Sequence, residues 1–379
     1  MSAPDDIPQP DRLEGAPHPR DTARLIGQGA AEAAFLDAWN SGRLHHAWLI
    51  TGPAGIGKAT LAWRLARFLL ATPPAAENGL FGAAPPPASL DIDPEHPVAR
   101  RMRALSEPGL FLLRRPWDER AKRLKREITV DETRRLKGFF AMSAADGGHR
   151  AVIIDAADEM NPSAANAVLK LLEEPPVRTT LFLISHQPSR LLPTIRSRCR
   201  ALRCHPLAPD DLLEALAATG AGMPEDTTAL SALADGSVGA ALNLLSGEGL
   251  AFYAALSALL ASLPALDRTA ALALTEKAAG RMGDGAADQA FAMIDLFLTR
   301  LARTGALGPP APEAVSGEAA LMARLCPDLC AARLWADLHQ TIGERARHGL
   351  AVNLDPAALL FDTVLKINAR AGELSPAPA

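Results

Sequence analysis

The chain has 379 residues, of which 48% are hydrophobic and 22% charged, so its composition excludes a wholly disordered protein. Its formal net charge of −4 excludes a strongly basic nucleic-acid binder as a whole and leaves room only for a local basic patch. No stretch approaches 18 consecutive apolar residues, so we expect no membrane span and no membrane partner. The length is typical of two or three domains.

Residues 1–20 are polar and contain five prolines without an apolar core. We expect a flexible tail there and no secretory signal. The four cysteines are too few and too clustered for a disulfide framework, which indicates a reducing cytoplasm. Neither Cys199 and Cys204 nor Cys326 and Cys330 show the C-x2-C spacing of structural zinc sites, and the latter pair fits helix packing. We therefore predict no bound metal.

The first half of the chain alternates strand and helix patterns. We expect a helix near 30–39, a strand at 46–51 and a helix at 58–71, followed by a Pro/Ala-rich insert at 72–97. A strand is expected at 109–113, a buried strand at 151–155, a helix at 161–174, a strand at 179–185 and a helix at 189–198. This alternation predicts an α/β domain over 21–207 with a parallel sheet.

From residue 208 the strand patterns end and Ala/Leu-rich helices take over. We predict a small helical domain at 208–248, a second helical domain at 250–372 and a tail at 373–379.

Residues 52–58 read Gly-Pro-Ala-Gly-Ile-Gly-Lys and fit the pattern G-x-x-x-x-G-K between a strand and a helix. Gly52, Gly55 and Gly57 allow backbone N–H groups to converge on phosphate oxygens, and Lys58 adds a positive charge at the helix N-terminus. The alternative is a chance glycine-rich turn, which the flanking strand and helix disfavour. The motif predicts that ATP or ADP binds here.

The residues needed for hydrolysis depart from this pattern. Ala59 stands where a Ser or Thr hydroxyl would ligate Mg²⁺. We count Thr60 among the candidate nucleotide-binding residues, but it lies about 100° round the helix and is not expected to replace that ligand. Asp155 ends a strand and is a candidate for the acidic residue near Mg²⁺, while Ala156 follows it where many P-loop ATPases carry a Glu. Asp158 and Glu159 read as solvated turn residues. Hydrolysis is expected to be weak.

Two basic features have ordinary interpretations beside functional ones. Arg198, in Ser197-Arg198-Cys199, stands among other arginines, so its position alone is weak evidence against a plain surface charge. The segment 114–137 holds ten Lys/Arg and five Asp/Glu. It suits a solvated helix face better than a DNA contact, since acidic residues are interleaved and no aromatic pattern suggests base stacking.

Three runs together carry a resemblance: "HHAWLITGPAGIGKATLAWRLARFLL", "RAVIIDAADEMNPSAANAVLKLLEEPP" and "PTIRSRC". With them the chain resembles the delta-prime family of bacterial DNA polymerase III clamp-loader subunits, which are AAA+ proteins. The resemblance covers roughly residues 20–248 by motif and 250–372 by architecture only.

The resemblance implies an AAA+ P-loop domain, a small helical lid and an all-α collar domain that joins the subunits. It implies that Arg198 is an arginine finger, which reaches the ATP site of a neighbouring tau/gamma subunit. The implied partners are tau/gamma and delta subunits, the sliding clamp and primer–template DNA, all in the cytoplasm. The four-cysteine zinc module of many family members is absent from 72–97, so no zinc is expected.

Compared with the catalytic tau/gamma relatives, this chain has Ala59, Ala156 and, in the lid motif, Gly239 instead of Arg. Ser185-His186 replaces the Thr or Asn of the sensor position. We therefore expect a non-catalytic, stator-like subunit that holds ATP or ADP without efficient hydrolysis. The alternatives are an autonomous ATPase motor of tau/gamma type and, less favoured by the net charge, a stand-alone DNA-binding protein.

Overall fold

The computed structural model describes residues 8–13, 15–22, 24–72, 85–141, 148–224, 226–280 and 286–374. The chain divides into two compact units. The first runs to Ala221 and includes Gly236–Gly239, and the second comprises Gly222–Asp235 and the chain from Ala240 onward. The three-part division with boundaries at 207/208 and 248/250 stays a prediction.

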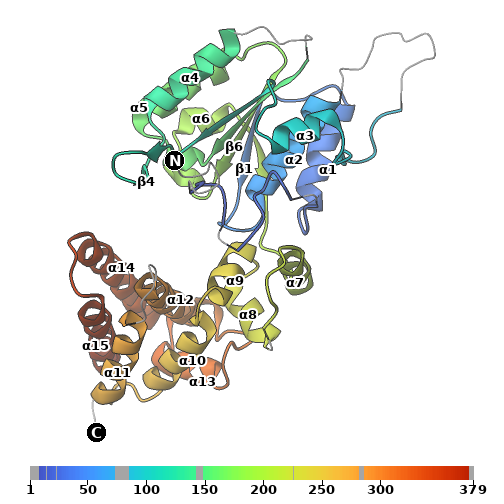
Figure 1. Cartoon of the computed structure of the whole chain (residues 1–379). Helices are drawn as coiled ribbons and strands as arrows, with labels where there is room; N and C mark the ends of the chain where they lie inside the picture. The colour runs from blue at the N-terminus through green and yellow to red at the C-terminus, as the bar shows by residue number, and fades with distance from the viewer. Residues whose placement is uncertain are drawn as a thin grey trace, which may run out of the picture. The chain divides into compact units, whose positions relative to one another are not determined.

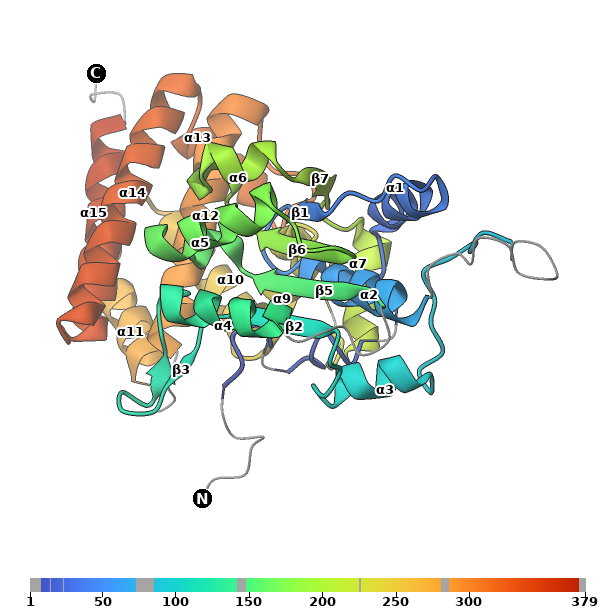
Figure 2. The ribbon, with the colours of Figure 1, turned by 90° about the horizontal axis from the view of Figure 1, so that it is seen from above.

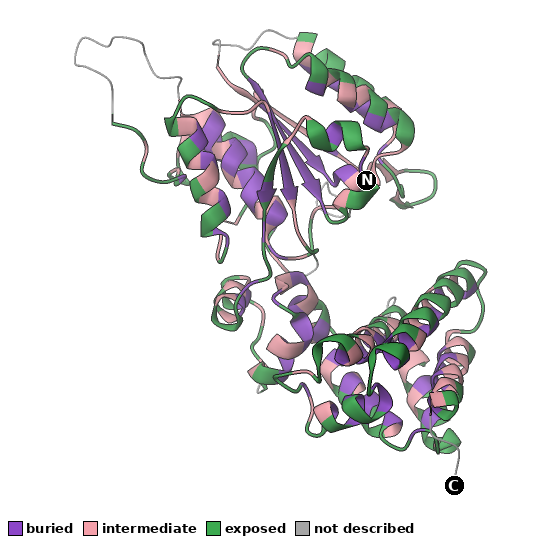
Figure 3. Ribbon diagram, turned by 180° about the vertical axis from the view of Figure 1, so that it is seen from behind, coloured by how far each residue is buried: buried purple, intermediate pink, exposed green. Residues whose placement is uncertain are grey.

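A five-stranded sheet forms the centre of the first unit (Figure 1). In spatial order its strands are β2 (Leu110–Arg114), β5 (Arg150–Asp155), β6 (Thr179–Ser185), β1 (Ala47–Thr51) and β7 (Arg200–Arg203). Every pairing is parallel. The central strands β5 and β6 are buried almost throughout, as their continuous apolar runs predict (Figure 3). The predicted α/β class with a parallel sheet is confirmed.

Helices cover both faces of this sheet (Figures 1 and 2). On one face, α1 (Gly29–Asn40) and α2 (Lys58–Ala71) bury Phe35 against Trp48 of β1 and Phe182 of β6. The short helix α3 (Pro97–Arg103) packs beside α2. On the other face, α4 (Val130–Ala141), α5 (Pro162–Glu173) and α6 (Pro193–Ser197) close a second apolar layer. Two apolar layers thus hold the strand ends in place.

Two elements of the first unit differ from the sequence-based expectations. β7 was not predicted, because only Leu202 of its four residues is buried and the strand lies at the sheet edge. The helix expected at 189–198 is instead a 3-10 turn at Pro188–Arg190 and the short α6, which begins at Pro193.

The helix-face interpretation of 114–137 is wrong for its first half. Residues 117–124 form a small antiparallel hairpin of β3 (Trp117–Asp118) and β4 (Arg123–Leu124), and helix α4 begins only at Val130. Asp118 turns this hairpin by accepting the backbone N–H groups of Arg120 and Ala121, both at 3.0 Å.

After β7 the described chain is helical, as predicted. The helices are α7 (Pro209–Ala218), α8 (Thr227–Ala234), α9 (Val238–Leu245), α10 (Gly249–Leu260), α11 (Arg268–Ala279), α12 (Ala286–Leu307), α13 (Glu318–Leu325), α14 (Leu329–Ala351) and α15 (Pro356–Leu374). Inside the second unit α12 packs along α14, and α11 packs against α15. The buried Glu318 carboxylate joins α13 to α12 through Arg300, at 2.9 and 3.0 Å, and accepts the Tyr253 hydroxyl of α10.

Within the described residues no single helix is both long and apolar enough to cross a bilayer; α9 and α10 reach that length and hydropathy only as a bent pair.

Candidate functional site

The P-loop lies between β1 and α2, as predicted. Gly52, Gly55 and Gly57 have φ values of 143°, 75° and 95°, a region that residues with a Cβ rarely adopt. Gly57 precedes α2, and no side chain caps that helix. A glycine-rich turn that leads into an uncapped helix N-terminus offers backbone N–H groups and positive potential to an anion. The loop therefore fits a phosphate-bearing ligand.

This loop is tied to two other segments of the same unit. The backbone N–H of Gly239 donates to the Gly55 carbonyl at 3.1 Å, and the Ser237 hydroxyl donates to the Ala54 carbonyl at 2.9 Å. The buried Gln28 amide donates to the Ile56 carbonyl at 3.1 Å. These bonds fix the loop through its carbonyl groups, which leaves its N–H groups for a ligand.

Gly55 and Gly239 approach so closely that a side chain on Gly55 would force the backbone apart, and one on Gly239 would be in tight contact. A Cβ on Gly55 would lie 2.8 Å from the backbone of Gly239, and a Cβ on Gly239 would lie 3.0 Å from Gly55. Gly239 is thus part of the packing around the P-loop.

Lys58 is a buried cation, with 3% of its surface exposed. Its ammonium donates to the Pro53 carbonyl, and it forms no ion pair within the part of the chain that the structure describes. Burial lowers the Lys58 pKa to about 8, against the opposing charges of Cys204, Asp155 and Asp158. A phosphate group would supply the anion that this ammonium lacks.

Asp155 ends β5 beside this lysine, as predicted. Burial, together with the nearby carboxylates of Asp11 and Glu159, raises the Asp155 pKa to about 7, and the charges of Lys58 and Arg114 act in the opposite direction. Arg114 is paired with Asp155 across the β2–β5 ladder. The ends of β2 and β5 and the start of α2 therefore bring a carboxyl group and two cations to one edge of the sheet.

The N-terminal segment also reaches this edge, although residues 1–20 were expected to form a flexible tail. Its described part places the buried Asp11 carboxylate in an ion pair with Arg114 and 3.2 Å from His18. The His18 ring in turn lies edge-on to Trp63 of α2, with 5.7 Å between the ring centroids. Residues 1–7 lie outside the described residues.

The groups that would complete a hydrolytic site are missing from their expected positions. Ala59 offers no hydroxyl in the first turn of α2, and the buried Ala156 follows Asp155. Thr60 lies on α2 with no hydrogen bond from its hydroxyl to any described residue. The site fits the phosphates of a nucleotide better than it fits Mg²⁺ with an attacking water.

Asp158 was expected only as a solvated turn residue, whereas the resemblance placed Ser185-His186 at the sensor position of this site. Asp158 accepts the backbone N–H of His186 at 3.0 Å and adds its charge near Lys58. Burial and the charge of Lys58 lower the His186 pKa. The position of Asp158 just beyond the end of β5 is the sequence signal that could have found it. Asp11, His18 and Gln28 have no such signal, because their partners are distant in sequence.

Arg198 lies at the end of α6, away from the P-loop motif in sequence, with 38% of its side chain exposed. Its guanidinium donates to the Thr194 carbonyl at 3.1 Å and lies 3.0 Å from a carboxylate oxygen of Glu173. The neighbouring Cys199 packs against the apolar layer of α5 and α6, and burial raises its thiol pKa to about 12. The Arg198 side chain is thus a partly exposed cation, and the residue that follows it is packed against buried apolar side chains.

The structure offers no cluster for zinc in the ranges it describes: no group of three His, Cys, Asp or Glu side chains converges there. The described cysteines 199, 204, 326 and 330 are all free. The predicted insert at 72–97 lies mainly outside the described residues, which resume at Pro85.

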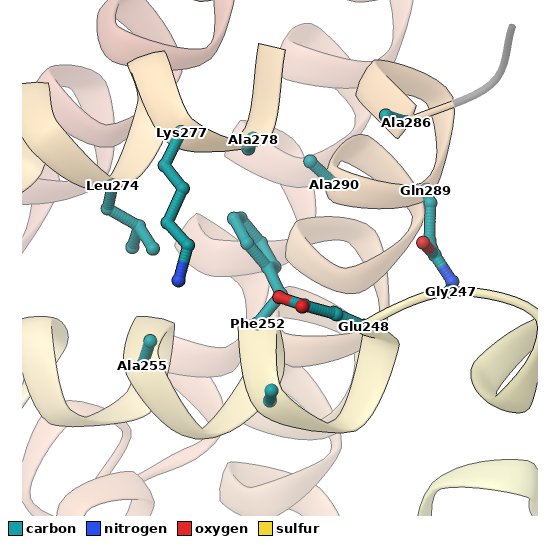
Figure 4. A pocket seen from close by; sticks show the side chains of 11 residues that line it. Gly247, Glu248, Phe252, Ala255, Leu274, Lys277, Ala278, Ala286, Gln289 and Ala290 are labelled. Carbon is teal, nitrogen blue, oxygen red and sulfur yellow. The ribbon is translucent and has the colours of Figure 1, made fainter. Parts of the chain in front are cut away.

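A separate cavity of about 230 Å³ lies in the second unit between α10, α11 and α12 (Figure 4). Phe252 and Leu274 give it an apolar lining, and Lys277 and Glu248 extend toward it. None of the predicted site residues belongs to it.

Comparison with known proteins gives a consistent result for the first unit. Residues 27–208 match the family described as DNA polymerase III, delta subunit. The chain is 40% identical over 194 residues to DNA polymerase III subunit delta' of Pseudomonas aeruginosa, a match that covers 47% of this chain and 53% of that protein. It is 32% identical over 217 residues to the subunit delta' of Escherichia coli strain K12, covering 56% of this chain and 58% of the relative.

A more distant relative carries the name of another subunit. The chain is 30% identical over 276 residues to DNA polymerase III subunit tau of Salmonella typhimurium, covering 70% of this chain and 39% of that protein. The chain spans about half the length of the two delta' relatives that it matches.

Proposed function

From the premise that residues 27–208 belong to the family of DNA polymerase III delta subunits, we propose that this chain is a delta-prime-type subunit of a clamp loader. In this function it is a stator-like, non-catalytic member of a hetero-oligomer that loads the sliding clamp onto primed DNA. The observation that carries the proposal is the combination of an intact phosphate cradle with absent hydrolytic groups and a partly exposed arginine at α6.

The cradle binds ATP or ADP through the P-loop glycines and Lys58. The left-handed glycines and the uncapped start of α2 suit phosphate oxygens, and the buried ammonium lacks a carboxylate partner among the described residues. When bound, the nucleotide supplies the negative charge that balances Lys58.

Hydrolysis in this site is slow for reasons of chemistry. Ala59 cannot ligate a metal ion, and Ala156 cannot orient an attacking water. Gly239 contributes no cation to the γ-phosphate, and a side chain there would be in tight contact with Gly55.

Arg198 acts in trans on a neighbouring tau/gamma subunit. A guanidinium stabilises the charge that spreads over the γ-phosphate in the transition state, a contribution on the order of 10³–10⁵ in rate. Its partial exposure suits a group that contacts a neighbour. The delta subunit, the sliding clamp and primer–template DNA complete the assembly in the cytoplasm.

Reconstitution of the loader with its tau/gamma and delta subunits tests this proposal. Arg198→Ala is expected to lower clamp- and DNA-stimulated ATP hydrolysis at the neighbouring site by on the order of 10³ while assembly stays intact. Arg196→Ala is the matched control, because Arg196 is an exposed arginine of the same short helix. Unchanged hydrolysis with Arg198→Ala would refute the finger function.

The second candidate is an autonomous ATPase of tau/gamma type, which the P-loop and the match to subunit tau favour. Steady ATP turnover by the isolated chain, abolished by Lys58→Ala, would support this motor and contradict the stator. We expect no such turnover, because both Ala59 and Ala156 lack the groups that it needs.

A further inference from the structure

The Arg198 guanidinium is held on two sides. One terminal nitrogen lies 3.0 Å from a carboxylate oxygen of Glu173, and the other donates to the Thr194 carbonyl at 3.1 Å. We propose that Glu173 is a positioning residue, which aims Arg198 at the nucleotide of the neighbouring subunit. This inference rests on the proposed function of Arg198 in trans.

Both residues of the ion pair have sequence neighbours that are buried in the same apolar cluster. Leu172 precedes Glu173 on α5, and Ile195 lies three residues before Arg198 on α6; both are buried in the same apolar cluster. Cys199 follows Arg198 and packs against that cluster. α5 and α6 lie side by side in both ribbon views (Figures 1 and 2). The carboxylate therefore holds a fixed position relative to the base of the arginine.

The place of Glu173 in its own helix is unfavourable for helix stability. It is the last residue of α5, where exposed carbonyl groups create negative potential that disfavours a carboxylate. The guanidinium of Arg198 offsets this charge. Because 44% of the Glu173 side chain and 38% of the Arg198 side chain are exposed, the pair contributes little to folding. Its main consequence is the direction in which the guanidinium points.

The two contacts leave the guanidinium able to act. A guanidinium has five N–H donors, of which the Thr194 carbonyl accepts one, while the Glu173 carboxylate lies beside the other terminal nitrogen. The donors that these two contacts do not use remain for phosphate oxygens. Holding one edge reduces the side-chain entropy that Arg198 loses when it meets the phosphate.

Glu174 provides a matched comparison within the same turn. It carries the same charge one residue later, and its carboxylate forms no ion pair or hydrogen bond with any residue in the described ranges. A general effect of negative charge at the end of α5 would involve both residues equally, whereas positioning of Arg198 involves Glu173 alone.

The experiment uses the reconstituted loader, with ATP, clamp and primed DNA. Glu173→Ala is expected to lower kcat by about two- to fivefold, the equivalent of one exposed ion pair, with the KM for ATP unchanged. Glu173→Gln keeps an oxygen acceptor and is expected to recover part of the rate. Glu174→Ala is expected to match the unmodified loader, and assembly of every variant is checked by size-exclusion chromatography.

The double variant Glu173→Ala/Arg198→Ala separates positioning from an independent effect. It is expected to be as slow as Arg198→Ala alone, because the carboxylate then has nothing to aim. A further loss in the double variant, or a Glu173→Ala rate equal to or above that of Glu174→Ala, would overturn the positioning function. If Arg198→Ala itself leaves the rate unchanged, the trans function fails, and the inference about Glu173 fails with it.

Discussion

Two regions of the first unit each carry a cation, but the two cations differ in burial: Lys58 lies at the P-loop edge, where β2 and β5 end, and Arg198 lies at the α6 edge, where α6 ends. Lys58 is buried, donates to a backbone carbonyl and has its pKa lowered to about 8. Arg198 is partly exposed and paired with Glu173. The P-loop is also enclosed by its own chain, since the N-terminal segment, Gln28 and Gly239 pack around it.

Substitutions at the two edges should therefore have different consequences. Around the P-loop, charges and backbone are buried together, so a substitution there changes folding stability as well as ligand binding. At α6 the charges are partly exposed and contribute little to folding, so a substitution there should leave stability nearly unchanged; under the proposed function its effect falls on the neighbouring subunit. Four of the five tryptophans, Trp39, Trp48, Trp63 and Trp117, lie in the first unit, so fluorescence reports on its unfolding.

The largest stability loss is expected from Asp11→Ala. This change leaves the buried His18 and the largely buried Arg114 without their carboxylate, which costs about 3–5 kcal/mol for a buried pair. Urea denaturation followed by tryptophan fluorescence measures the free energy of unfolding. Asp131→Ala, which breaks an exposed pair with Arg134 on α4, is the control and should cost less than about 1 kcal/mol. Equal losses of unfolding free energy in the two variants would show that the ion pair of Asp11 with Arg114 does not anchor the N-terminal segment at the P-loop edge.

Next in size is Gly55→Ala, at an expected cost of about 2–4 kcal/mol. The new Cβ would lie 2.8 Å from the Gly239 backbone in addition to the strain of a φ of 75°. Gly42→Ala isolates the strain, because Gly42 has a φ of 67° and open space around its Cα, and should cost only about 1–2 kcal/mol. The same urea titration distinguishes them, and indistinguishable values would contradict the close packing of Gly55 on Gly239.

Lys58→Met is expected to stabilise the chain by about 1–3 kcal/mol at pH 7 while it abolishes nucleotide binding. The folded pKa of about 8 lies below the ordinary value of 10.5, so between these values the unfolded chain holds more protons on this lysine. The contribution of Lys58 to the free energy of unfolding therefore rises from pH 8 to pH 10.5. Over the same pH range the variant should lose its greater stability relative to the unmodified chain. Denaturation of both proteins at pH 7 and pH 10 measures the difference between their free energies of unfolding. A variant that is less stable than the unmodified chain at pH 7 would contradict the claim that the buried Lys58 ammonium lacks an anionic partner.

The smallest change in stability is expected from Arg198→Ala and Glu173→Ala, each within about 1 kcal/mol of the unmodified chain. Their free energies of unfolding come from the same fluorescence titration. Losses comparable to that of Asp11→Ala would mean that the pair is a structural element of α5 and α6, and the contrast between the two edges would disappear.

Several elements and the main site residues follow from local sequence. The helix predicted at 58–71 has those bounds in α2, and the apolar runs at 151–155 and 179–185 form β5 and β6. Gly52, Gly55, Gly57 and Lys58 lie together because they are neighbours in one loop, and Asp155 joins them because parallel strands end at one edge. Local spacing and hydrophobic period suffice for features of this kind.

Other features depended on contacts between distant segments. β7 became a strand because the edge of β1 was available for pairing, although its own sequence is largely polar. Asp11 forms an ion pair with Arg114, and Arg198 forms one with Glu173. Gln28 hydrogen-bonds to the carbonyl groups of Ile56 and His205. None of these partners is a near neighbour in the sequence.

The G-x-x-x-x-G-K loop and the alanine that follows its lysine can be read directly from the chain, since both features concern a few consecutive residues. The enclosure of that loop and the contacts of Arg198 depend instead on how distant segments pack. The physical reason is that burial and charge pairing are properties of the whole packed unit: desolvation lowers the Lys58 pKa, and a carboxylate from another helix restrains the guanidinium.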